Sequence, residues 1–149
     1  MDMKVVDLRD VKKNRLILVV EDVYETRAGI DTLLKATGYR VVSAGVELEV
    51  LNTTRPERPD LILVSGAALP NNVLGTVGRL RKGAAVGDEV PVVVFCAQDI
   101  PEGEEVAIGG NVYLTNPDNF NQLRKLLARL LSEVSHGGMI DEEEQILED

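Results

Sequence analysis

DLILVS, residues 60–65, decides the fold, because four consecutive aliphatic residues lead into a small hydroxyl residue, Ser65. An apolar run of this length is typical of a strand that is buried on both faces of a sheet. A similar run, RLILVV at residues 15–20, ends at an acidic pair, Glu21 and Asp22. Two carboxylates at a strand end commonly serve a cation or phosphoryl site that a third acid completes. Residue 65 is not an acid, and the interpretation of the site depends on that absence.

The remaining strands and helices follow from the spacing of apolar residues. Further apolar runs predict strands at 40–44, 92–96 and 112–114, in addition to 15–20 and 61–64. Helical spacing predicts helices at 24–37, which Gly38 would terminate, at 46–54, at 73–81, and more weakly at 99–108, which contains Pro101 and Gly103. The last helix, capped by Asp118 or Asn119, has one apolar face made of Phe120, Leu123, Leu127, Leu130 and Val134.

Five strands that alternate with five helices predict an α/β doubly wound fold, with a five-stranded parallel sheet and helices on both faces. In such sheets the functional crevice lies beyond the carboxyl ends of the strands. That rule selects Glu21, Asp22, Ser65, Cys96 and the loop after Val112 as candidate site residues.

Length and composition restrict the class of protein. The 149 residues, 44% hydrophobic and 28% charged, are those of one ordinary globular domain. Residues 139–149 contain six acids and no base, so the remainder carries only −3 of the net charge of −9. No basic stripe indicates nucleic-acid binding. No apolar run reaches the ~18 residues of a membrane helix, and no signal peptide is evident, so we expect a cytoplasmic protein.

The arrangement of these motifs resembles the receiver domain of two-component response regulators, the CheY-like family, which has a flavodoxin-like (βα)5 fold. The resemblance covers about residues 14–134, with residues 1–13 as an N-terminal extension and 135–149 as an acidic tail. The tail is expected to be solvated or to bind a basic partner. The order and spacing of five motifs carry the resemblance: RLILVVED (15–22), GYRVVSA (38–44), RPDLILVS (58–65), VPVVVFCA (90–97) and VYLTNP (112–117).

The resemblance implies a role for each site residue. In the family an acidic pair helps to bind Mg²⁺, and an Asp at the end of the third strand accepts a phosphoryl group. A Ser or Thr after the fourth strand and a Lys before a late proline then contact the phosphate. This chain keeps the pair as Glu21 and Asp22 but has Ser65, Cys96 and Asn116 at the other three positions. Three departures at one site predict a pseudo-receiver that has abandoned aspartyl phosphorylation.

Several interpretations of single residues stay open. Glu21 and Asp22 form a weak Mg²⁺ site or are solvated strand-end acids, and no other cofactor is expected. Ser65 is a packing residue or an alternative acceptor, and Cys96 is inert or redox-sensitive. Tyr113, at the family's aromatic switch position, is a switch or part of a static partner surface.

The expected function is that of a signalling interaction module without enzymatic activity. Its expected partner is a histidine kinase or an output protein, with no nucleic acid and no membrane. The resemblance also implies a homodimer face made by the fourth helix, fifth strand and fifth helix. The alternative is a small-molecule or redox sensor that uses the vacated crevice beside Ser65, Cys96 and Asn116.

Overall fold

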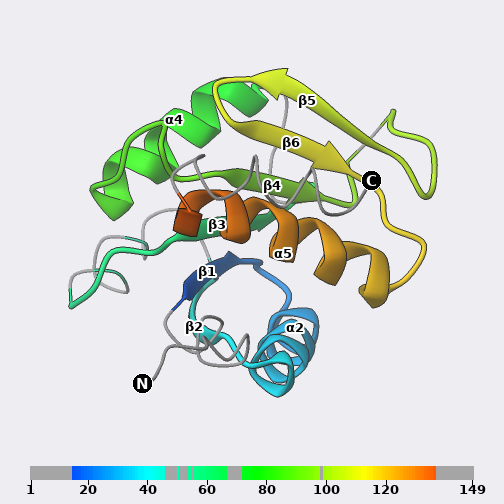
Figure 1. Ribbon diagram of the computed structural model, residues 1–149, viewed down its shortest axis with the longest axis horizontal. Helices are drawn as coiled ribbons and strands as arrows, with labels where there is room; N and C mark the ends of the chain where they lie inside the picture. The colour runs from blue at the N-terminus through cyan, green and yellow to red at the C-terminus, as the bar shows by residue number, and fades with distance from the viewer. Residues whose placement is uncertain are drawn as a thin grey trace, which may run out of the picture.

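The computed structural model describes residues 15–45, 50, 54, 56–66, 72–97 and 99–136. These residues form a six-stranded sheet with the order β2-β1-β3-β4-β6-β5 (Figure 1). Neighbouring strands are parallel except for β5 and β6, which are antiparallel. The strands are β1 (Leu16–Val20), β2 (Arg40–Ala44), β3 (Leu61–Ser65), β4 (Val92–Phe95), β5 (Glu105–Gly109) and β6 (Val112–Thr115). The helices are α2 (Tyr24–Thr37), α4 (Val73–Ala84) and α5 (Phe120–His136).

The apolar core lies on both faces of the sheet. Every residue of β1, β3 and β4 is buried. Val77 and Leu80 of α4 pack against one face, whereas Leu34 of α2 and Leu127 of α5 pack against the other (Figure 1). The predicted five parallel strands with helices on both faces are therefore confirmed.

The helix ends have local causes that are partly visible in the sequence. Gly38 ends α2 with a φ of 118°, and its N–H donates to the carbonyls of Leu34 and Lys35. The left-handed cap predicted at this glycine is confirmed. Before α5, Asn119 Oδ1 accepts from the Gln122 amide at 3.0 Å, and Gln122 Oε1 accepts from the Asp118 amide at 2.7 Å. This reciprocal pair satisfies two N–H groups that the start of a helix otherwise leaves unpaired.

The helix predicted at Asp99–Ile108 is wrong, because the second half of this segment is the strand β5. Positive φ values at Asp99 (69°) and Gly103 (86°) prevent a continuous helix. Val106 then pairs with Leu114 of β6 across an antiparallel hairpin. The turn uses three successive residues with positive φ, Gly109, Gly110 and Asn111. Consequently residues 99–109 contain no helix. The homodimer face was expected to include a helix there, and the strand β5 takes its place.

Some predictions fall mostly outside the described residues. Of the helix expected at 46–54, only Val50 and Thr54 are described, both in helical conformation, and Thr54 Oγ1 donates to the Val50 carbonyl at 2.8 Å. The N-terminal extension at 1–13 and nearly all of the acidic tail at 135–149 lie outside the described residues. Within the described part of the chain, no helix is long and apolar enough to span a membrane.

Candidate functional site

The carboxyl ends of four neighbouring strands bring the candidate residues to one edge of the sheet. Val20 lies opposite Val64, so Glu21 and Asp22 follow β1 directly beside Ser65, the last residue of β3. Ser65 in turn lies opposite Phe95. Because Phe95 lies opposite Thr115, Cys96 and Asn116 follow β4 and β6 at the same level. The strand register therefore places all five candidates at this carboxyl edge.

Glu21 faces inward, and its carboxylate is already engaged. The residue is only 3% exposed, and its Oε2 accepts a hydrogen bond from the Val23 amide at 2.9 Å. Its backbone is held as well, because its N–H donates to the Ala44 carbonyl at 3.0 Å. Asp22, by contrast, is exposed. The acid pair thus consists of one buried carboxylate that stabilises its own turn and one solvated carboxylate.

Ser65 is buried at 3% exposure, and the strand end around it is tightly packed. A Cβ added to the next residue, Gly66, would lie 2.5 Å from the Cys96 carbonyl oxygen and 3.0 Å from that of Phe95. These are backbone atoms of the neighbouring strand end, which cannot rotate away. Gly66 therefore allows the chain to pass close to the end of β4, a requirement that the linear sequence does not reveal.

Cys96 has a left-handed backbone with a φ of 57°, which is unusual for a residue with a side chain. This conformation ends β4 at Phe95, one residue before the predicted end. Cys96 is exposed and carries a free thiol. The position that holds a hydroxyl in the receiver pattern is thus a solvent-accessible thiol in this chain.

Asn116 connects the end of β6 to the loop that follows β4. Its Nδ2 donates to the Ile100 carbonyl at 3.1 Å. Its carbonyl accepts from the Gly103 amide at 2.6 Å, and its N–H donates to the Glu104 carbonyl at 3.2 Å. The side chain is therefore used to hold the loop at residues 100–104. It is neutral, so it brings no positive charge to the crevice.

Tyr113 lies in β6 and packs against the core beneath α2 and α5. Its Oη donates to Asn111 Oδ1 at 3.1 Å. Because Asn111 precedes β6, the hydroxyl is directed toward the amino edge of the sheet, opposite to the edge that holds Ser65. In this conformation the tyrosine does not contribute to the crevice.

Two residues near the site were not selected from the sequence. Arg27 of α2 donates from Nη1 to the Glu21 carbonyl at 2.5 Å, and its guanidinium lies 5.6 Å from the centre of the Tyr24 ring. Thr115 is buried, and its Oγ1 donates to the Glu104 carbonyl at 3.0 Å. A basic residue on a surface helix is usually solvated, and a threonine in a strand is usually a packing residue. The sequence therefore did not indicate a role at the site for Arg27 or Thr115.

The donor set does not match a strong Mg²⁺ site. Magnesium requires several oxygen ligands in octahedral geometry. Here the Glu21 carboxylate is hydrogen-bonded to the backbone, Asp22 is solvated, and Ser65 carries no charge. Among the described residues, no group of three His, Cys, Asp or Glu side chains is placed to hold a metal ion. The carboxylates that the described residues bring to this edge are those of Glu21 and Asp22.

Comparison with known proteins supports the fold. The chain matches no protein-family model. It is 24% identical over 122 residues to sporulation initiation phosphotransferase F of Bacillus subtilis. The aligned region covers 79% of this chain and 94% of that protein.

Solved receiver domains have the same architecture. The receiver domain of a sensor histidine kinase from Pseudomonas aeruginosa, solved with magnesium in its active-site cleft, is 21% identical with a TM-score of 0.58, covering 79% of this chain and 98% of that one. A CheY-like receiver domain protein from Methanospirillum hungatei is 15% identical with a TM-score of 0.61, covering 80% and 96%. The chain therefore has the CheY-like receiver fold, as the sequence motifs predict.

Proposed function

We propose that this protein is a receiver-type module of two-component or phosphorelay signalling that acts by binding a protein partner, without aspartyl phosphorylation and without enzymatic activity of its own. The observation that carries the proposal is the position of Ser65 at the end of β3, beside the acid pair. In the receiver fold this is the place of the phosphoacceptor. A serine hydroxyl is a weak nucleophile unless a neighbouring base activates it.

The surroundings of Ser65 support the same conclusion. Phosphorylation adds close to two negative charges, which a metal ion and a cationic side chain must balance. The Glu21 carboxylate accepts a hydrogen bond from the Val23 amide, and Asn116 donates to the Ile100 carbonyl. Neither residue supplies the positive charge that a new phosphoryl group requires.

A surface next to this edge supports partner binding. The adjacent apolar residues Val23 and Tyr24, just before and at the start of α2, are exposed, at 49% and 68%. Contiguous exposed apolar surface commonly marks a protein interaction site. A histidine kinase or an output protein of the same signalling system is the proposed class of partner.

Incubation with acetyl phosphate and Mg²⁺, followed by intact-mass measurement at neutral pH, tests the proposal. We expect no acid-labile phosphoryl adduct, while a receiver that carries the acceptor aspartate is labelled in parallel. Stoichiometric labelling of this chain by acetyl phosphate or by a histidine kinase would refute the proposal.

The alternative function is a redox or small-molecule sensor at the same crevice, and the exposed thiol of Cys96 is the observation that favours it. Oxidation sensing needs an accessible thiolate, and Cys96 meets the requirement of access. Thermal-shift measurements with quinones, flavins and nucleotides, and with mild peroxide, would test it. A response that Cys96→Ser abolishes would favour the sensor, whereas a flat response to every compound would exclude it.

A further inference from the structure

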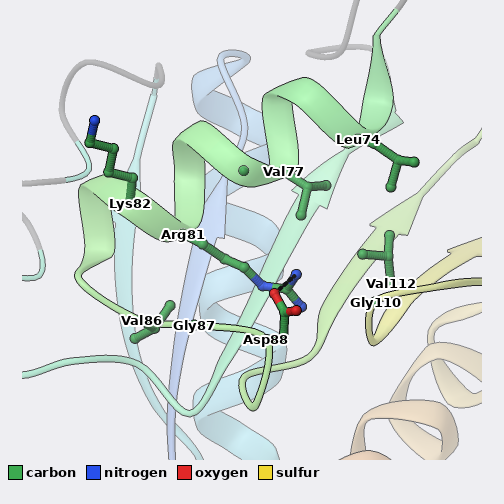
Figure 2. Close-up of a pocket in the computed structure, with 10 residues that line it drawn as sticks. Leu74, Val77, Arg81, Lys82, Val86, Gly87, Asp88, Gly110 and Val112 are labelled. Atoms are coloured by element: carbon green, nitrogen blue, oxygen red, sulfur yellow. Dashed lines mark hydrogen bonds and ion pairs between the residues drawn. The ribbon is translucent and has the colours of Figure 1, made fainter.

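A pocket of about 480 Å³ lies between α4 and the amino edge of the sheet, away from the candidate site (Figure 2). One wall comes from α4, with Leu74, Val77 and Arg81. The opposite side comes from Val86 in the turn before β4 and from Val112 at the start of β6. The pocket is a groove open to solvent, because Leu74, Gly87 and Asp88 in its lining are exposed, and it is large enough for a small organic molecule.

Arg81 is the buried charge of this pocket. The residue is only 7% exposed, and burial lowers the pKa of its guanidinium, while the nearby Asp88 and Glu89 oppose that shift. Its Nη2 donates to the Val90 carbonyl at 2.7 Å and to the Asn111 carbonyl at 3.3 Å. These two bonds connect the turn before β4 to the turn before β6 and fix the orientation of the guanidinium.

The rest of the guanidinium is poorly satisfied. Arginine has five N–H donors, and an unpaired buried donor is costly. Among the described residues, Nε of Arg81 has no hydrogen-bond partner. Its Nη1 contacts a single carboxylate oxygen of Asp88 at 3.3 Å, and the Asp88 side chain is 85% exposed. An exposed partner at this distance contributes little, so the buried cation is only weakly compensated.

Figure 2 shows how charge and apolar surface are arranged around the pocket. The side chains of Leu74, Val77 and Val112 gather on one side of the Arg81–Asp88 pair, and Lys82 points away from it. Among the described residues that line the pocket, Arg81 is the one cation on the side of these apolar side chains. The guanidinium of Arg81 already donates to a carboxylate there, that of Asp88, which also lines the pocket.

We propose that this pocket binds a small organic monocarboxylate with a short branched apolar body. The ligand carboxylate replaces that of Asp88 as the acceptor for Nη1 of Arg81, because Nη2 already donates to the carbonyls of Val90 and Asn111. The apolar body lies against Val77 and Val112 and is thereby removed from water. One cation, with Asp88 and Glu89 close by, suits a single negative charge better than a phosphate dianion.

A titration with isovalerate, followed by amide ¹H–¹⁵N NMR, tests the proposal on the full chain. We expect saturable shifts at the backbone amides of Gly87, Asp88 and Gly110, which line the pocket. Isovaleramide has the same shape without the charge. It should bind about tenfold more weakly than isovalerate, since charge-assisted hydrogen bonds are about twice as strong as neutral ones. Inorganic phosphate should give no saturable shift at these residues. Equal binding of acid and amide, saturation by phosphate, or the absence of shifts with isovalerate would overturn the proposal.

Two variants make the test independent of any folding defect at Arg81. Gly78 lines the pocket, and a Cβ there would meet no atom within 4 Å, so Gly78→Leu should fold and fill the space. Gly29 in α2 is equally open, which makes Gly29→Leu the matched control. We expect Gly78→Leu to abolish the isovalerate shifts and Gly29→Leu to retain them. Unchanged affinity in Gly78→Leu would contradict the assignment of the site.

Asp88→Asn provides a test of opposite sign. Because Asp88 is proposed to compete with the ligand, removing its charge should tighten isovalerate binding by up to about fivefold, the range expected for an exposed ion pair. Weaker or unchanged binding would show that Asp88 does not occupy the ligand position. Phosphorylation of the chain at the carboxyl edge has no bearing on these outcomes, so this proposal and the proposed signalling function can fail separately.

Discussion

β3 and β5 are strands of five residues in the same sheet, yet every residue of β3 is buried and every residue of β5 is exposed. β3 lies between β1 and β4, whereas β5 pairs with β6 at the edge of the sheet (Figure 1). Val106 and Ile108 of β5 remain 41% and 36% exposed. The comparison indicates that the centre of the sheet supplies the stability. The strand β5 replaces the helix expected at residues 99–108, and it lies at an edge where it buries little apolar surface.

The largest expected effect is that of truncating a side chain at the centre. Leu63 is completely buried in β3, so Leu63→Ala should lower the free energy of unfolding by about 2–5 kcal/mol. The matched change at the edge, Val106→Ala, should cost about 1 kcal/mol or less, since much of the valine stays in water. Urea unfolding monitored by circular dichroism measures both. Comparable losses would show that the edge strand belongs to the cooperative core.

The next effect tests how closely the centre is packed at its carboxyl end. Gly66→Ala places a Cβ 2.5 Å from the Cys96 carbonyl oxygen, so the ends of β3 and β4 must move apart. Overpacking of this kind costs about 1–3 kcal/mol. In Gly29→Ala the new Cβ meets no atom within 4 Å. That control should gain up to about 1 kcal/mol from helix propensity.

Thermal unfolding compared across these two alanine variants gives the result. A Gly66→Ala protein as stable as the parent would mean that the two strand ends are looser than the structure shows. Both substitutions add the same methyl group, so the sharper test is whether Gly66→Ala lowers the stability while Gly29→Ala raises it.

The same contrast explains which parts of the fold are visible in the sequence. β1, β3 and β4 are continuous apolar runs, and their ends can be located from the residues alone to within one residue. Because parallel strands end at one edge, the positions of Glu21, Ser65 and Cys96 relative to one another followed from those ends. Local signals such as Gly38 also identified the end of a helix.

What the sequence did not reveal depends on partners that lie outside the element concerned. Glu105–Gly109 becomes a strand by pairing with β6, and its own composition resembles a poor helix. Arg81 looks like an ordinary solvated residue of α4, and its burial depends on the carbonyls of Val90 and Asn111. Gly66 is required because the Cys96 carbonyl approaches it from another strand. The contacts of Arg81 and Gly66 join residues 9 to 30 positions apart, and the pairing of β5 with β6 joins residues 3 to 10 positions apart. In each case the partner lies outside the element itself, so the pattern of that element does not encode the contact.

The smallest expected effect concerns β2, the strand at the opposite edge of the sheet. Arg40 of β2 donates from Nη1 and Nη2 to the two carboxylate oxygens of Glu57, both at 2.6 Å. The hydrogen bond from Arg40 is the main reason that the pKa of Glu57 lies below its ordinary value. The pair is about half exposed, so its coupling should be about 0.2–1 kcal/mol at low salt.

The sign of the pH dependence follows from the direction of the pKa shift. A carboxyl group whose pKa is lowered by folding stabilises the protein above its ordinary pKa and loses that contribution as the pH falls through the lowered value. The stability difference between the parent and Glu57→Gln should therefore be present at neutral pH, shrink as the pH falls through the lowered pKa of Glu57, and also shrink in high salt. A double-mutant cycle with Arg40→Met measures the coupling directly. A coupling free energy as large as the loss in Leu63→Ala would contradict the view that the sheet edges contribute little to stability. A coupling of about a few tenths of a kcal/mol would show that β2, like β5, contributes much less to stability than β3.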